Sequence, residues 1–291
     1  MPIIKSMKIY GSIVKATFQN LRKKPSLFKP FLYLSLIELL GLMVIYWAPQ
    51  PPVSLVLGQP IRAFYGEAAL HYPSHLLVLP QIFRIWQIIA GVVFGSLLTG
   101  IAISMYNQEA KGMSMRFGKN FKITFNRYLP LLAYTLVTFI IIYLVEHFSG
   151  NFIKGRLEAG SGYFLKMGQI KWSVVLAFFN LCFSIAIETL FMYVPVLIII
   201  ENIGFWRAAG ISIKTVCHYF ATSILLVLVP VLFYMAAVIS KVFIPRLMDK
   251  VFPEMSLVIL GAGILIALLV NTIIAVSATI LYLSVKESKA E

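Results

Sequence analysis

The chain has 291 residues, of which 60% are hydrophobic and only 12% charged, and this balance excludes an ordinary soluble domain. A formal charge of +14 would indicate nucleic acid as the partner of a soluble protein, but here the basic residues adjoin long apolar runs. We therefore expect anionic lipid headgroups and no nucleic acid as partners. The two cysteines, Cys182 and Cys217, exclude a disulfide framework and a Cys-based metal site.

The N-terminal segment predicts an amphipathic helix over residues 7–24 that lies in the membrane interface. Its apolar stripe consists of Tyr10, Val14, Phe18 and Leu21. Its basic residues, which we expect to bind lipid headgroups, are Lys8, Lys15, Arg22, Lys23 and Lys24.

Six apolar runs are each long enough to cross a bilayer core of roughly 30 Å as a helix. They predict membrane spans at about 31–48, 82–106, 128–146, 172–200, 219–240 and 256–285. A proline-rich external loop over 49–81, with a short helix around 64–71, separates the first two spans. A glycine-rich external loop over 147–171 separates the third and fourth. The chain is therefore expected to be all-α and to form a single polytopic membrane domain over residues 1–291.

Each odd-numbered span follows a basic, amphipathic stretch in which a lysine lies close to a threonine. These pairs are Lys15 with Thr17, Lys122 with Thr124, and Lys214 with Thr215. The pattern predicts three helical hairpins, each preceded by a cytoplasmic interfacial helix. Either common ancestry or a shared way of entering the membrane explains it.

Orientation follows from the basic residues. The side that holds both predicted termini carries sixteen Lys and Arg residues, and the rest of the chain carries nine. The positive-inside rule then places both termini in the cytoplasm of a protein in the plasma (inner) membrane. In the second span, Gly91, Gly95 and Thr99 are small residues at a spacing that favours close helix packing.

Polar side chains inside the spans are candidates for a functional site. The candidates are Glu38, Asn180, Ser184, Glu188 and Asn271. Charged groups at bilayer depth cost about 2.5 to 3.5 kcal/mol on insertion scales, so Glu38 and Glu188 require an explanation. Either they face a cavity and bind a cation, a proton or a headgroup amine, or they are protonated and hydrogen-bond across a helix interface. We expect Asn271 to pack against the face of Ser184 and Glu188.

Outside the spans, Glu67, His71 and His75 recur every four residues, a spacing that can hold zinc on one helix face. Pro73 interrupts that helix, and no third imidazole or cysteine stands nearby, so we predict no metal and no other cofactor. G-x-S-x-G, HExxH and Walker motifs are missing from the sequence, and a catalytic residue is not expected.

Two stretches resemble a known family. They are NLRKKPSLFKPFL at residues 20–32 and VPVLIIIENIGFWRAAGISIKTV at residues 194–216. The chain is similar there to the six-helix bacterial inner-membrane proteins of the YciC type and to the membrane domain of some glycerophosphodiester phosphodiesterases. The resemblance implies an envelope role without a defined catalytic residue.

Two functions are compatible with these features. The first is a non-enzymatic envelope component that contacts lipids, organises the membrane or docks a partner, which would be an envelope protein or a second copy of the chain. The second is a small proton- or cation-linked transporter that uses Glu188.

Overall fold

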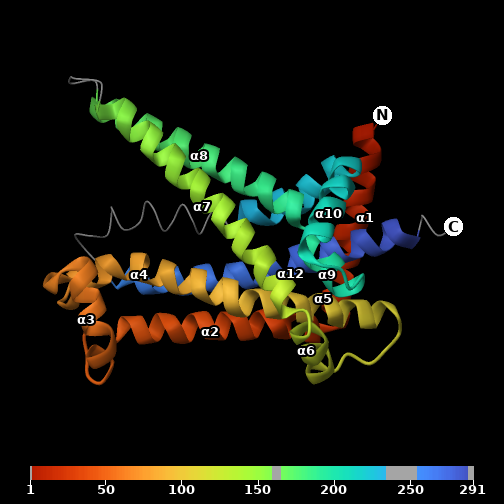
Figure 1. Ribbon diagram of the computed structural model, residues 1–291, viewed down its shortest axis with the longest axis horizontal. Helices are drawn as coiled ribbons and strands as arrows, with labels where there is room; N and C mark the ends of the chain where they lie inside the picture. Colours follow the sequence, from red (N-terminus) through yellow and green to blue (C-terminus); the bar gives the residue numbers. More distant parts are fainter. Residues whose placement is uncertain (1, 159–164, 234–253, 288–291) are drawn as a thin grey trace.

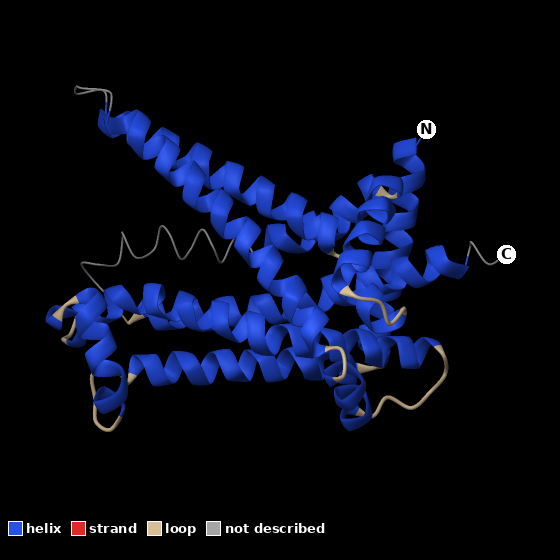
Figure 2. Ribbon diagram, in the orientation of Figure 1, coloured by secondary structure: helices blue, strands red, loops and turns tan. Residues whose placement is uncertain are grey.

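The computed structural model describes residues 2–158, 165–233 and 254–287, and side chains within them except at 2–6 and 152–177. Everything regular in this part of the chain is helical, as Figure 2 shows. The helices of the N-terminal half are α1 (Pro2–Lys23), η1 (Pro25–Phe28), α2 (Lys29–Tyr46), α3 (Val53–Tyr65), η2 (Glu67–Leu70), α4 (Ser74–Ala90), the π-helical η3 (Gly91–Gly95), α5 (Ser96–Ala110) and α6 (Phe117–Phe125). Those that follow are α7 (Tyr128–Glu158), α8 (Leu165–Phe191), α9 (Val194–Ile200), α10 (Phe205–His218) and α12 (Met255–Glu287), with a further helical stretch at Phe220–Phe233.

Five stretches are long and apolar enough to cross a membrane: Pro25–Tyr46, Ser74–Ala110, Tyr128–Asn151, Phe178–Ile200 and Met255–Glu287. A sixth is formed if α10 and Phe220–Phe233, which are bent by 99° relative to each other, count as one span. The prediction of an all-α, multi-pass membrane protein is therefore confirmed. The last seven residues of the predicted fifth span, residues 234–240, lie outside the described residues.

Three long helices form a slab and a hairpin diverges from it. In Figure 1, α2, α4 and α12 run side by side, and α2 contacts both of the others. The hairpin of α7 and α8 leaves this slab at an angle. Helices α1, α6 and α10 gather around the end of the slab where α5 lies. They precede α2, α7 and Phe220–Phe233 in the order that the sequence predicts, and their location in a membrane interface stays a prediction.

The largest apolar core surrounds α9, the short helix inside the fourth span. Val194, Val196 and Ile198 are fully buried there, packed with residues of α7, α10 and α12. Tyr193, just before α9, is also fully buried, and its hydroxyl lies 2.9 Å from the Ser223 hydroxyl. Because lipid and core are equally apolar, such interlocking packing and hydrogen bonding is what fixes helices to one another in a membrane.

The N-terminal helix packs on α12 with a face that differs slightly from the predicted stripe. Ile13, Thr17 and Leu21 are buried, and the Thr17 hydroxyl lies 3.0 Å from that of Ser277. Phe18, predicted to belong to the apolar stripe, is 55% exposed. A polar residue, Thr17, can occupy the centre of the buried face because its hydroxyl is hydrogen-bonded to Ser277 of α12.

Helices extend into both segments that the sequence predicts as external loops. The helix of the second predicted span begins at Ser74, inside the first of these segments, and Pro80 lies within α4. Pro80 lies in the interior of α4, where it has no N–H to donate to the carbonyl of Leu76, yet the helix continues through it. The predicted loop over 147–171 is helical at 147–158 and 165–171. No proline occurs between Pro130 and Pro195, so little there opposes long helices.

The predicted fourth span is not one continuous helix, because α8 ends at Phe191 and α9 starts at Val194. Pro195 occupies the first turn of α9. Its ring would clash with the carbonyl of Phe191, four residues earlier, in an uninterrupted helix, and it has no N–H to donate. The break therefore follows from the proline.

Close helix approach occurs at glycines other than the predicted pair. A Cβ added at Gly91 would meet nothing within 4 Å, and one at Gly95 would meet Leu34 at an ordinary 3.7 Å. By contrast, a Cβ at Gly41 would overlap the indole of Trp86, and one at Gly100 would lie 2.5 Å from Thr124. The tight contacts are thus between α2 and α4 and between α5 and α6.

Candidate functional site

A cavity of about 400 Å³ lies where the α7–α8 hairpin leaves the slab. Residues of α2, α4, η3, α5, α7, α8, α9 and α12 line it. The bent pair of α10 and Phe220–Phe233 contributes Val227, so every candidate span contributes to the cavity. The volume falls in the range of small-molecule sites, and most of the lining is apolar, as in such sites.

Two interruptions of regular α-helix border the cavity. The first is η3, whose Gly91 and Gly95 both line it. The second is the break between α8 and α9, where Met192 and Pro195 line it. A short π-helical segment such as η3 widens the helix locally, and such segments recur at functional sites. The predicted packing pair Gly91 and Gly95 therefore borders open space.

Both carboxylates that the sequence marks as candidates within the spans line this cavity. Glu38 on α2 accepts a hydrogen bond from the Gln87 amide of α4, with a nitrogen–oxygen distance of 3.4 Å. Glu188 on α8 is exposed to the cavity, and within the described part of the chain its carboxylate forms no hydrogen bond or ion pair. Tyr134 of α7 lines the same cavity as Glu188.

The remaining polar lining consists of neutral groups. Asn271 of α12 is exposed to the cavity, and Thr138 of α7 has a buried hydroxyl oxygen without a hydrogen-bond partner in the described structure. The lining contributed by described residues includes no Lys, Arg or His. Two carboxylates with neutral donors and acceptors favour a cation, and the apolar walls favour one that carries a hydrocarbon part.

The sequence-predicted residues separate into two groups. Glu38, Glu188, Asn271 and Thr99 line the cavity. Asn180 accepts a hydrogen bond from Ser149 of α7 at 2.9 Å, and Ser184, one turn further along α8, does not line this cavity. Asn271 and Glu188 thus share a cavity that Ser184 does not line.

Sequence reasoning missed Gln87, Tyr134 and Thr138. Gln87 precedes Gly91 by four residues, so a polar and small stripe runs from Gln87 through Gly91 and Gly95 to Thr99. The Gln87 amide, at the N-terminal end of this stripe, is the feature of the sequence that could have indicated a cavity wall. Tyr134 and Thr138 are also four residues apart, but nothing in an apolar helix rich in Thr and Tyr distinguishes them.

The candidate metal residues do not converge. Glu67 pairs with Arg62 at 2.8 Å, and His71 lies 3.9 Å from the same carboxylate. His75 is buried, with its Nε2 atom 2.9 Å from the carbonyl oxygen of Tyr46. Among the residues that the structure describes, no three His, Cys, Asp or Glu side chains are grouped to hold a metal.

The basic face of α1 is mostly available to headgroups. Lys8, Lys15, Arg22 and Lys23 are exposed. Lys24 is instead 2.7 Å from the carboxylate of Glu109 on α5, which ties the end of α1 to the end of the second span. Headgroup binding by the other four stays a prediction.

No protein-family model, curated protein or solved structure matches the chain, so a function has to rest on the chemistry of the cavity.

Proposed function

We propose that this chain is a non-enzymatic, multi-pass protein of the plasma (inner) membrane that binds the amine of a lipid headgroup in its intramembrane cavity. Both termini lie in the cytoplasm in this proposal, in accord with the excess of basic residues on that side. The envelope role that the resemblance to YciC-type proteins implies is compatible with it.

The carboxylate of Glu188 is the observation that carries the proposal. It borders a cavity of about 400 Å³ and has no hydrogen-bond or ion-pair partner among the described residues. An unpaired carboxylate at bilayer depth is costly, and a bound ammonium would offset that cost. Glu38 supplies a second negative charge in the same cavity, and the apolar walls suit the hydrocarbon part of a lipid.

Native mass spectrometry of the full chain tests this, with the protein released from nanodiscs of equal phosphatidylethanolamine and phosphatidylglycerol. We expect the wild type to retain phosphatidylethanolamine and Glu188→Gln to lose it. Glu67→Gln, which neutralises an exposed carboxylate that does not line the cavity, is the matched control and should retain phosphatidylethanolamine. Equal retention of the two lipids by the wild type would contradict a lipid amine.

A second arm separates a lipid amine from a free amphipathic amine. Dodecylamine and dodecanol have similar apolar chains, and only the first carries an ammonium group. If dodecylamine alone raises the unfolding temperature of the wild type while no lipid is retained, the ligand is a free amine. If neither compound nor lipid distinguishes wild type from Glu188→Gln, the amine site is wrong.

The two helix interruptions favour proton- or cation-linked transport as a second candidate. Transporters commonly bind substrate near the middle of the membrane at discontinuous helices, and here η3 and the α8–α9 break both border Glu188's cavity. In proteoliposomes, uptake of an amphipathic amine that depends on a pH gradient and is lost in Glu188→Gln would support transport. Uptake that Glu188→Gln leaves unchanged would contradict it.

A further inference from the structure

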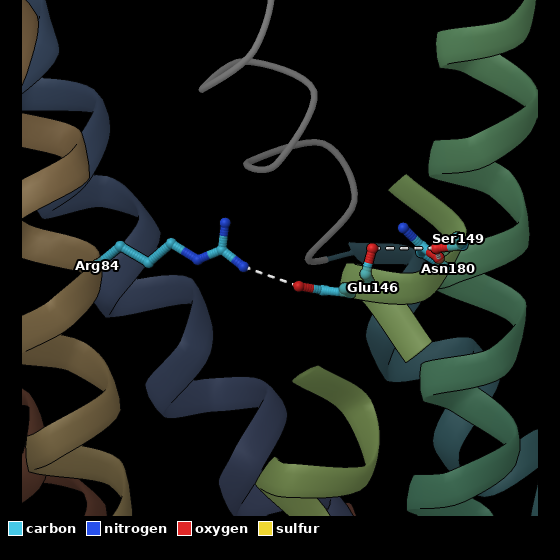
Figure 3. A network of polar contacts seen from close by, with 4 residues as sticks. All are labelled: Arg84, Glu146, Ser149 and Asn180. Atoms are coloured by element: carbon cyan, nitrogen blue, oxygen red, sulfur yellow. Dashed lines mark hydrogen bonds and ion pairs between the residues drawn. The ribbon is translucent and has the colours of Figure 1, made fainter. Parts of the chain in front are cut away.

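One ion pair crosses the space between the slab and the diverging hairpin. Figure 3 shows Arg84 extended from α4 toward Glu146 of α7, and the guanidinium and carboxylate are 2.9 Å apart. The Arg84 side chain is 70% exposed and that of Glu146 36% exposed, so both charges lie at the surface of the described structure.

The pair lies one helical turn beyond the cavity on both helices. Gln87 and Ile142 are cavity-lining residues of α4 and α7. Arg84 precedes Gln87 by three residues, and Glu146 follows Ile142 by four, so each lies on the same helix face as its neighbour. The ion pair therefore spans the two helices at the edge of the cavity, on the side toward α3 (Figure 1).

Among the described residues, the other hydrogen bond between these two parts of the chain lies at the opposite end of the cavity. Near η3, the Tyr128 hydroxyl donates to the carbonyl of Val93 at 3.1 Å. Beyond that point, within the described residues, no hydrogen bond or ion pair other than Arg84–Glu146 links α4 to α7. A break in the pair would remove the polar link that the described residues make between α4 and the far half of α7.

Movement of α7 would be transmitted to the helix that carries Glu188. Next to Glu146, the Ser149 hydroxyl bonds the Asn180 side chain of α8, as Figure 3 shows. Asn180 is two helical turns from Glu188 on the same helix. The sequence-predicted Asn180 thus connects the Arg84–Glu146 pair with the cavity through α7 and α8.

We propose that the Arg84–Glu146 ion pair is an access gate of the cavity, which an incoming ammonium opens by competing with Arg84 for the Glu146 carboxylate. The gate rests on the proposed binding of an amine in the cavity. In this proposal, Arg84 and Glu146 determine how fast the amine enters the cavity, whereas Glu38 and Glu188 determine how tightly it is retained.

The test measures entry without requiring a natural ligand. Thr138 lines the cavity, so Thr138→Cys, in a chain that also carries Cys182→Ala and Cys217→Ala, places a single thiol there. The probe is 2-aminoethyl methanethiosulfonate, a small ammonium reagent, and the readout is its rate of reaction with the thiol in nanodiscs. We expect Arg84→Gln and Glu146→Gln each to raise this rate by about tenfold or more.

Charge reversal supplies the decisive comparison. Arg84→Glu or Glu146→Arg alone should speed the reaction, and the two together should restore the slow wild-type rate because the pair re-forms with opposite polarity. Arg62→Gln breaks the exposed Arg62–Glu67 pair of α3 and η2 and should leave the rate unchanged. Wild-type rates in both single Gln variants, or a double reversal as fast as the single ones, would overturn the gate.

The outcome is separable from that for amine binding. The reaction rate reports access to Thr138 whether or not a lipid is retained, and lipid retention reports Glu188. Retention that depends on Glu188, together with rates that ignore Arg84 and Glu146, would reject the gate alone. Rates that depend on the pair without any amine retention would reject the proposed ligand and keep the gate.

Discussion

Glu38 of α2 and Glu188 of α8 line one cavity, although they belong to the first and fourth predicted spans. Glu38 accepts a hydrogen bond from Gln87, whereas Glu188 has no hydrogen-bond or ion-pair partner among the described residues. The two carboxylates therefore differ in how well the protein itself compensates their charge, and Glu188 is the one left for a ligand.

This difference predicts that Glu188→Gln stabilises the ligand-free protein while it removes amine binding. Insertion scales assign a cost of roughly 2.5 to 3.5 kcal/mol to a charged side chain at bilayer depth. Removal of the unpaired charge should recover part of this cost and raise the free energy of unfolding by about 1 kcal/mol. The measurement is thermal unfolding in lipid-free detergent, with Glu67→Gln as the control for an exposed carboxylate. A lower unfolding temperature in Glu188→Gln would indicate a structural carboxylate.

Gly100 and Gly91 lie on the same span and should respond oppositely to an added methyl group. At Gly100 the new Cβ would lie 2.5 Å from Thr124 and 2.7 Å from Leu131, both fully buried. We expect Gly100→Ala to lower the free energy of unfolding by about 1 to 3 kcal/mol through overpacking. Gly91→Ala, which meets nothing within 4 Å, should leave it unchanged or raise it slightly. Thermal unfolding of both variants measures the two effects. A similar loss of stability in Gly100→Ala and Gly91→Ala would contradict the prediction that only Gly100 is tightly packed.

The fold class was predictable because apolar length alone identifies membrane helices. Helix ends were less predictable. Pro80 suggested a loop, yet it lies in the second turn of α4, and Pro195 divides the fourth span although the run around it is continuously apolar. A proline's effect depends on its position within the helix, which hydropathy does not specify.

The candidate site was predictable in its charges and not in its geometry. Glu38, Glu188 and Asn271 stood out because polar groups are rare at bilayer depth, and the structure brings all three to one cavity. Their meeting depends on how the α7–α8 hairpin diverges from the slab, which no local pattern encodes. For the same reason Asn180, identical in type to Asn271, joins Ser149 instead.

Asn120 should be essential for holding α6 on α5. Its side chain accepts a hydrogen bond from Ser104 at 2.6 Å and donates to Gln108 at 3.1 Å and to the carbonyl of Arg116 at 2.9 Å. Asn120 is fully buried, so Asn120→Ala leaves these groups unpaired and should destabilise the protein by about 1 to 3 kcal/mol. Exposed Asn126, at the end of the same helix, supplies the control Asn126→Ala, expected to have little effect in thermal unfolding.

Glu201, just after α9, is linked to the end of α12. Its carboxylate accepts hydrogen bonds from the Lys286 ammonium at 2.6 Å and from the Tyr282 hydroxyl at 2.9 Å. The hydrogen bond from Lys286 lowers the pKa of Glu201 below its ordinary value, and that from Tyr282 acts in the same direction, while partial burial opposes both. Glu201 thus couples the core helix α9 to the C-terminal span.

This coupling predicts a pH-dependent stability. A carboxyl group with a lowered pKa in the folded state stabilises the fold above its unfolded pKa of about 4.3, and this contribution is lost as the pH falls through the folded pKa. Because the Glu201 side chain is 30% exposed, solvent screening limits the contribution to about 1 kcal/mol. Glu201→Gln should therefore unfold about 2 °C below the wild type at pH 7. This difference should begin to shrink as the pH falls below about 4.3 and should vanish once the pH is below the folded pKa of Glu201. Glu287→Gln, on the exposed residue after Lys286, should match the wild type at pH 7. A Glu201→Gln deficit that persists unchanged at low pH would show that packing, not the ionised hydrogen bond to Lys286, stabilises this contact.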